Sequence, residues 1–251
     1  MTEIPCDAVL FDLDGVLVRS MGLIERILRE WAAGHGLDTD AVVALSHGRR
    51  DIDLVRLVVP HLDAEAETAR ITEREERDFA GLEPVPGAPE LVAALPADRW
   101  AIVTSGTRAV ALGRLDAAGV PRPVHLVAAE DITRGKPDPE GYLRGAALLG
   151  VDPARCVVVE DAPSGAAAAA AAGMRCVGVG GAVADPAVRL TARVVDLRTV
   201  EVLHGPGAPG REQGPGPGPG PGSGPGPGPG PGSGPALGLR ISEPTGKGPA
   251  A

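Results

Sequence analysis

Aromatic rings, lysine and long apolar runs are scarce in this 251-residue chain. Aromatic residues make up 2% of it and the formal net charge is −9, whereas nucleic-acid surfaces need basic side chains and stacking rings. No apolar stretch approaches the ~18 residues that a membrane-spanning helix requires. The first residues, MTEIPCDAVL, also lack the basic and then apolar layout of a signal peptide. The sequence therefore predicts a cytoplasmic protein with no nucleic-acid partner and no membrane association.

Cysteine is also rare, and its three positions are Cys6, Cys156 and Cys176. Their number is odd, and they are too scattered for the paired spacing of a zinc site. We expect three buried free thiols, because an unpaired cysteine behaves as a small apolar side chain.

Apolar side chains become sparse after about residue 205, where glycine and proline alternate over most of the remaining chain. Proline removes backbone donors, glycine raises the entropic cost of ordering, and few apolar groups offset that cost. The repeat has a period of two, which excludes a collagen helix, since that needs glycine at every third residue. The composition predicts a disordered tail over 205–251, whose deletion should leave turnover unchanged.

Short apolar runs alternate with helical patterns through the rest of the chain. Unbroken apolar runs of this length are typical of parallel strands buried on both faces. The predicted strands are AVLF, WAIVT, VHLVAA, CVVVE and RCVGV, and the helices between them include RAVALGRLDAAG, PEGYLRGAALLG and SGAAAAAAAG. This alternation predicts an α/β fold with a doubly wound parallel sheet. Residues 19–83 carry helical patterns and no strand signal, which indicates a helical insertion after the first strand.

Asp12 and Asp14 end the first predicted strand, in the stretch AVLFDLDGVL. Residues two apart in a strand point to the same side, and the carboxyl ends of strands bind ligands in open α/β sheets. Two neighbouring carboxylates repel each other unless one takes up a proton or a cation binds between them. The pair therefore predicts a divalent cation site, and Gly15 lets the chain turn away beside it.

Three further strand ends or loops carry polar groups. Thr104, Ser105 and Gly106 follow the second strand, where hydroxyls and amides can form a phosphate cradle. Lys136 is one of two lysines in a chain that otherwise relies on arginine, which indicates a place that needs a compact ammonium group. Glu160 and Asp161 end the strand CVVVE, and their oxygens suit a hard cation such as Mg²⁺.

Taken together, residues 6–180 resemble the haloacid dehalogenase-like hydrolase superfamily, whose four motifs they match in order. DLDGVL resembles the first motif, Thr104 the second, Lys136 the third, and the pair Glu160 and Asp161 the fourth. The resemblance implies a Rossmann-like core over 1–18 and 84–204, a small helical cap over 19–83, a Mg²⁺ cofactor and an aspartyl-phosphate intermediate.

The resemblance also assigns roles to the matching residues. Asp12 is implied as the nucleophile and Asp14 as the general acid and base. Metal contacts are implied for Asp12, the backbone carbonyl of Asp14, Glu160 and Asp161, and phosphate contacts for Thr104, Ser105, Gly106 and Lys136.

The residues in and around these motifs are similar to those of the sugar- and polyol-phosphate phosphatases of the superfamily. We expect a Mg²⁺-dependent phosphatase that acts, as a monomer, on small sugar or polyol phosphate monoesters, with His47 and Arg49 of the cap setting specificity. Two alternatives stay open: a sugar-phosphate mutase of the β-phosphoglucomutase kind, and a non-catalytic scaffold whose tail recruits partners.

Overall fold

A six-stranded parallel sheet forms the centre of the computed structural model, which describes residues 1–181, 189–204 and 237–242. In sheet order its strands are β4 (His125–Val127), β3 (Trp100–Val103), β2 (Ala8–Phe11), β5 (Cys156–Glu160), β6 (Arg175–Val179) and β7 (Ala192–Val194). Five of these strands match the predicted apolar runs. The first strand of the sheet in the chain, β2, lies between β3 and β5, so the chain winds outward from it in both directions.

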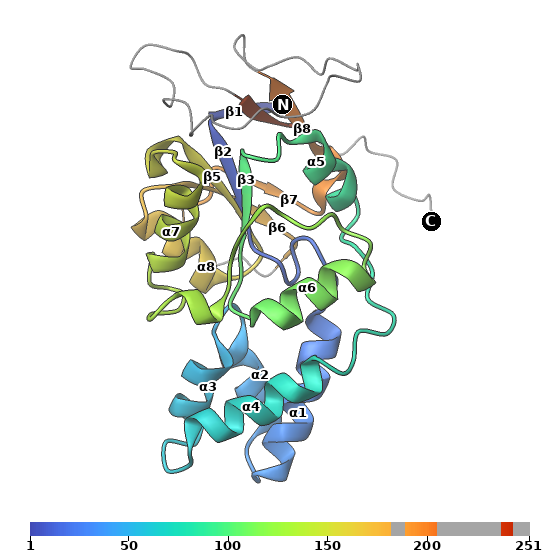
Figure 1. The fold of residues 1–251 in the computed structure, drawn as a ribbon, viewed down its shortest axis with the longest axis vertical. Coiled ribbons are helices and arrows are strands. Elements are labelled where there is room, and N and C mark those ends of the chain that lie inside the picture. Colours follow the sequence, from blue (N-terminus) through green and yellow to red (C-terminus); the bar gives the residue numbers. More distant parts are fainter. Residues whose placement is uncertain (182–188, 205–236, 243–251) are drawn as a thin grey trace, which may run out of the picture.

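Helices cover both faces of this sheet (Figure 1). One face carries α5 (Ala88–Ala94) and α6 (Arg108–Ala117), and the other carries α7 (Glu140–Leu149) and α8 (Pro163–Ala171). The β2 side chains alternate accordingly: Val9 and Phe11 join one apolar cluster, and Ala8 and Leu10 join the other. The predicted doubly wound, Rossmann-like architecture is confirmed. Short 3₁₀ turns complete the connections: η1 (Ala129–Asp131), η2 (Pro153–Arg155) and η3 (Leu197–Thr199).

Four helices follow β2 and lie beyond the carboxyl end of the sheet (Figure 1). They are α1 (Met21–Gly34), α2 (Thr39–Ser46), α3 (Asp51–Val58) and α4 (Ala64–Glu75), which we call the cap. Aspartate side chains accept hydrogen bonds from the first amides of α2 and α4, as N-caps do. All four helices fall inside the predicted helical interval. No helix in the described part of the chain is long and apolar enough to cross a bilayer.

A second, three-stranded antiparallel sheet lies at the opposite end of the molecule from the cap (Figure 1). Its order is β1 (Thr2–Cys6), β9 (Leu237–Ile241) and β8 (Val200–His204). The prediction of disorder for 205–251 is therefore wrong for Leu237–Ile241, whereas 205–236 and 243–251 lie outside the described residues. The sequence LGLRI alternates, so that three apolar side chains are buried at alternate positions while β1 and β8 pair with the backbone.

The three cysteines are buried and unpaired, as predicted. Burial raises the pKa of each thiol to about 12. They are therefore protonated, apolar components of the core.

Candidate active site

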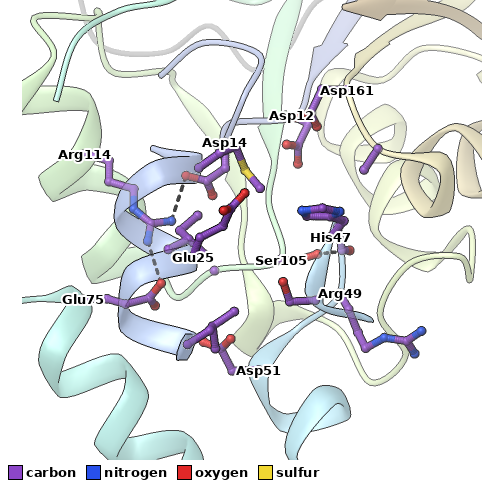
Figure 2. Close-up of a pocket in the computed structure, with 17 residues that line it drawn as sticks. Asp12, Asp14, Glu25, His47, Arg49, Asp51, Glu75, Ser105, Arg114 and Asp161 are labelled. Carbon is purple, nitrogen blue, oxygen red and sulfur yellow. Dashed lines mark hydrogen bonds and ion pairs between the residues drawn. The ribbon is translucent and has the colours of Figure 1, made fainter. Parts of the chain in front are cut away.

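The predicted site residues gather at the point where the sheet changes winding direction. Asp12 directly follows β2, Thr104 follows β3, Glu160 ends β5 and Asp161 follows it. Because these three strands are neighbours and parallel, their carboxyl ends meet at one edge, where open α/β sheets bind ligands. Figure 2 shows Asp12, Asp14 and Asp161 around one pocket, with cap residues facing them.

Gly15 makes this gathering possible. Its φ of +79° lies in the left-handed region, so the chain turns sharply after the two aspartates. A Cβ atom there would lie 1.9 Å from Oδ2 of Asp161. Any other residue would displace the carboxylate of Asp161 from its place beside the first motif.

Lys136 lies in a buried hydrogen-bond network beneath the pocket. Its Nζ donates to Oδ1 of Asp12 at 2.5 Å and to Oε1 of Glu160 at 2.7 Å. The hydroxyl of Tyr142 also donates to Oε1 of Glu160 (2.8 Å), and the amide of Ala162 donates to Oε2 (2.9 Å). Burial alone would lower the pKa of Lys136, but Asp12 and Glu160 outweigh it and raise that pKa above its ordinary value. Lys136 is therefore a fixed positive charge against Asp12.

Tyr142 was not among the predicted site residues. It is the single tyrosine of the chain and belongs to the same stretch, RGKPDPEGYL, as Lys136. Its ring lies 5.2 Å from Nζ of Lys136 and so helps to enclose the ammonium group.

The acidic cluster has the composition of a divalent cation site. Asp12, Glu160 and Asp161 each offer a carboxylate oxygen, and these atoms lie within 4.8 Å of one another. Burial raises the pKa of Asp12 to about 7 despite Lys136, and burial together with Asp12 and Glu160 raises the pKa of Asp161 to about 9. One lysine thus faces two buried carboxylates and a half-buried one, and this excess of negative charge and oxygen donors fits a cation such as Mg²⁺.

Within this cluster Glu160 differs from the two aspartates. It is fully buried, and both of its oxygens already accept hydrogen bonds from Lys136, Tyr142 or Ala162. Asp12 and Asp161 both line the pocket. The geometry therefore separates a carboxylate that holds Lys136 from two that face a ligand.

The turn after β3 places Ser105 and Gly106 in the pocket wall, whereas Thr104 is buried directly before them and does not line the pocket. Gly106 donates its amide to Oγ1 of Thr104 at 3.1 Å. Since a hydroxyl that accepts one hydrogen bond still has its own proton to donate, Thr104 can donate to an anion. The Ser105 hydroxyl donates instead to the backbone carbonyl of Gly48 in the cap (2.8 Å), which leaves its side chain a contact between cap and core.

Asp14 is held by two donors that sequence reasoning missed. The hydroxyl of Ser20 donates to its Oδ1 at 2.5 Å, and Nη1 of Arg114 donates to the same oxygen at 2.8 Å. Nη2 of Arg114 donates to Oε1 of Glu75 at the end of α4 (2.6 Å; Figure 2). One feature of the sequence could have indicated Arg114: it is a charged residue on the apolar face of a helix. It shares the buried face of α6 with Val110, Ala111 and Leu115.

Comparisons with known proteins agree with this geometry. Residues 6–173 match the model of a family described as haloacid dehalogenase-like hydrolase. The chain belongs to the haloacid dehalogenase-like hydrolases. It is 43% identical to hexitol phosphatase A of Escherichia coli K12 over 182 residues, which cover 69% of this chain and 83% of that protein. It is 37% identical to glycerol-1-phosphate phosphohydrolase 1 of Saccharomyces cerevisiae, over 69% of this chain and 74% of the relative.

A solved structure supports the same assignment. A haloacid dehalogenase-family hydrolase from Deinococcus radiodurans R1, solved with bound phosphate and sodium, superposes with a TM-score of 0.54 at 31% identity. The match covers 76% of this chain and 91% of that one. Membership of this hydrolase family makes the chain an enzyme and does not favour the alternative of a non-catalytic scaffold.

The cap supplies the opposite wall of the pocket in this hydrolase. His47 and Arg49, the predicted specificity residues, both line the pocket. Figure 2 shows the Arg49 side chain running away from Asp12 and Asp14, and its Nε donates to the carbonyl of Leu45 (3.0 Å). Arg50 is buried and donates to the carbonyls of Ile132 and Thr133 next to the Lys136 loop.

Acidic side chains dominate the polar part of this wall. Glu25, Asp51 and Glu75 line the pocket from α1, α3 and α4. Burial, reinforced by Glu75, raises the pKa of Asp51 to about 8. The cap therefore presents hydrogen-bonding carboxyl groups to whatever the pocket holds.

Proposed function

We propose that this hydrolase is a Mg²⁺-dependent phosphatase that cleaves small sugar or polyol phosphate monoesters. The observation that carries the proposal is the convergence of Asp12, Asp14, Lys136 and Asp161 at one strand edge, in a family whose similar members include a hexitol phosphatase. The roles below follow from their contacts.

Asp12, Asp161 and the backbone carbonyl of Asp14 would hold the Mg²⁺, because Glu160 is occupied by Lys136, Tyr142 and Ala162. A bound Mg²⁺ would offset the negative charge of the carboxylates and of the substrate phosphate, so that anion can approach anion.

The reaction has two steps. Lys136 holds Oδ1 of Asp12, so Oδ2 attacks phosphorus; a P–O bond to Asp12 forms as the bond to the substrate oxygen breaks. Asp14 gives its proton to the departing alkoxide. In the second step Asp14 takes a proton from water as that water attacks phosphorus, the bond to Asp12 breaks, and inorganic phosphate leaves.

The remaining groups bind the transferring phosphoryl group. The hydroxyl of Thr104 donates a hydrogen bond to one phosphoryl oxygen, and the backbone amides of Ser105 and Gly106 donate to the others, with Gly106 releasing Thr104 to do so. Lys136 adds positive charge next to the oxygens on which charge collects in the transition state.

The charges of the pocket favour a phosphatase over the mutase alternative. A mutase must hold a second phosphate on the cap side, which requires free cations there. Of the described residues that line the pocket, the arginines and lysines are Arg49 and Arg114. Arg114 is bound to Asp14 and Glu75, and the side chain of Arg49, although it lines the pocket, runs away from Asp12 and Asp14 (Figure 2). Glu25 would repel a second phosphate, and Asp51, whose pKa burial raises to about 8, adds no positive charge there.

The same acidic wall fits a substrate rich in hydroxyl groups. Carboxyl oxygens of Glu25 and Asp51 accept hydrogen bonds from hydroxyls, and the His47 ring can donate or accept one. We assign His47 to substrate contact, and we retain Arg49 as a specificity residue at the rim.

The test is a phosphate-release screen across hexitol, glycerol, hexose and pentose phosphates, with Mg²⁺ and with a chelator. We expect Mg²⁺-dependent release of inorganic phosphate from several polyol and sugar monoesters and no isomerisation of β-glucose 1-phosphate. Isomerisation without phosphate release would establish the mutase instead, and turnover unaffected by chelation would refute the metal.

A further inference from the structure

Arg114 forms a buried link between the cap and the first motif. Its side chain is 2% exposed, that of Glu75 is 6% exposed, and that of Asp14 is 16% exposed. Its two terminal nitrogens donate to different acids, one on each side of the boundary between core and cap. An arginine fork suits this arrangement because its donors have fixed relative directions.

The two acids also mark the two connections between core and cap. Asp14 comes just before the connection that enters α1, and Ser20, its second donor, ends that connection. Glu75 is the last residue of α4, where the chain starts back to the core. This return connection packs on α6, because a Cβ at Gly113 would lie 2.3 Å from the Phe79 ring. From a single position on α6, Arg114 thus contacts an acid at each of the two connections between core and cap.

The contacts on Asp14 are one-sided. Ser20 and Arg114 both donate to Oδ1. Two donors on one oxygen restrict rotation of the carboxyl group, which directs Oδ2 to the pocket that Asp14 lines (Figure 2). An acid and base that must face first an alkoxide and then a water depends on this orientation.

Burying these charges is costly. Taking an arginine and two carboxylates out of water is repaid only with good geometry, and apolar side chains in their place often give equal or greater stability. Val110, Ala111 and Leu115 show that this face of α6 packs well with apolar residues. A role in stability alone therefore does not account for the arginine.

We propose that Arg114 is a positioning residue that couples closure of the cap to the orientation of Asp14. When the cap is closed, Glu75 accepts a hydrogen bond from Nη2 of Arg114. Nη1 then donates to Asp14 and fixes the orientation of its carboxyl group. When the cap opens, Glu75 withdraws and Asp14 loses a fixed orientation, so proton transfer is efficient only in the closed enzyme. The inference rests on the acid and base role proposed for Asp14.

The leaving group distinguishes positioning from a general structural role. An alkoxide from a polyol phosphate needs a proton from Asp14 as it departs, whereas p-nitrophenolate leaves without one. In a single turnover, Arg114→Met and Glu75→Gln should slow release of the alcohol at least ~10-fold while release of p-nitrophenol changes less than about threefold. Arg114→Lys, which reaches one acid at a time, should give an intermediate result.

A double variant tests whether the two residues act through one link. Arg114→Met combined with Glu75→Gln should slow alcohol release no more than Arg114→Met alone, since both break the same link. Arg108→Met, an exposed position on the same helix paired with Asp131, is the matched control and should leave both rates unchanged.

Equal slowing of both leaving groups, or additive effects in the double variant, would overturn the coupling. If Arg114→Met does not fold, Glu75→Gln carries the same test, because it removes the charge that holds this link while keeping the size of the side chain. Failure of the proposed function itself would look different: the wild-type enzyme would release no phosphate from either ester.

Discussion

The two ends of the parallel sheet use charge in opposite ways. At the carboxyl end, Asp12 and Asp161 lie close together and both have raised pKa values. A single lysine, Lys136, compensates the charge of the acidic cluster there. At the other end, in the sheet of β1, β9 and β8, Arg240 forms exposed ion pairs with Glu3 and Glu201 over an apolar interior. The carboxyl end therefore carries more negative than positive charge in a partly buried site. At the other end, each charge of these ion pairs has an opposite partner and both are exposed to solvent.

This difference indicates that charged residues at the carboxyl end serve the proposed reaction, whereas residues at the other end contribute to the stability of the fold. Desolvated like charges destabilise a fold unless a ligand compensates them, and perturbed pKa values therefore concentrate at functional sites. Exposed ion pairs contribute little, whereas burial of apolar strands contributes much. Changes at the carboxyl end should therefore affect activity, and changes at the other end should affect stability.

Asp12→Asn should have the largest effect. Phosphate release should fall at least ~10³-fold, because the amide cannot form the covalent intermediate. The melting temperature in metal-free buffer should stay the same or rise, since burial already penalises the Asp12 carboxylate and Lys136 keeps Glu160 as its partner. Glu3→Gln at the other end is the control and should leave turnover unchanged. Substantial residual turnover in Asp12→Asn would remove Asp12 as the nucleophile.

A chain ending at His204 should lose stability, because it lacks β9. Leu237, Leu239 and Ile241 are buried, and full burial of such a side chain contributes about 1.5–3 kcal/mol. We expect the melting temperature to fall by more than ~10 °C at this chain length. The prediction that deleting 205–251 leaves turnover unchanged did not take this strand into account.

The control for that truncation keeps β9. Because His204 pairs with Leu237 in antiparallel register, an Asn-Gly turn in place of 205–236 should close a hairpin and retain the melting temperature. Arg240→Ala should cost under ~1 kcal/mol, as exposed ion pairs do. Equal stability of the truncated and hairpin chains would contradict the role of β9.

Asp161→Asn should weaken the metal site while leaving the fold intact. The Mg²⁺ concentration needed for half-maximal phosphate release should rise at least ~10-fold, because a carboxylate ligand of a hard cation becomes a neutral amide. Titrating activity against Mg²⁺ measures this. An unchanged Mg²⁺ response would place the cation elsewhere.

Asp51→Asn should have the smallest effect, a change in pH dependence. Burial and Glu75 raise the folded pKa of Asp51 from the ordinary 3.8 to about 8, so its favourable contribution is present below pH ~4 and is lost as pH rises through 8. Between pH 5 and 9, without Mg²⁺, the melting temperature of the wild-type protein should fall more steeply than that of Asp51→Asn. Parallel curves would show that Asp51 is paired or solvated.

Sequence reasoning found the residues whose position follows from strand ends. Asp12, Thr104, Lys136 and Asp161 follow apolar runs or stand out by composition, and parallel strands bring their ends together. Sequence reasoning missed the hydrogen-bonded pair of Arg114 and Glu75. These two residues meet because α4 packs beside α6, and their spacing in the chain does not indicate this contact.

The C-terminal strand was missed for a related reason. Glycine and proline dominate the composition after residue 205, and a five-residue alternation such as LGLRI is weak evidence by itself. It becomes a strand because β1 and β8 each offer an edge to pair with.

The sequence by itself determined the doubly wound sheet, the helical interval and the four acidic, hydroxyl and lysine motifs, because hydrophobic period and strand ends are local properties. Only the tertiary structure decided which charges meet across the boundary between cap and core, and where β9 inserts. Those contacts join residues far apart in the chain, and their energies depend on burial and on partners that exist only once the chain is folded.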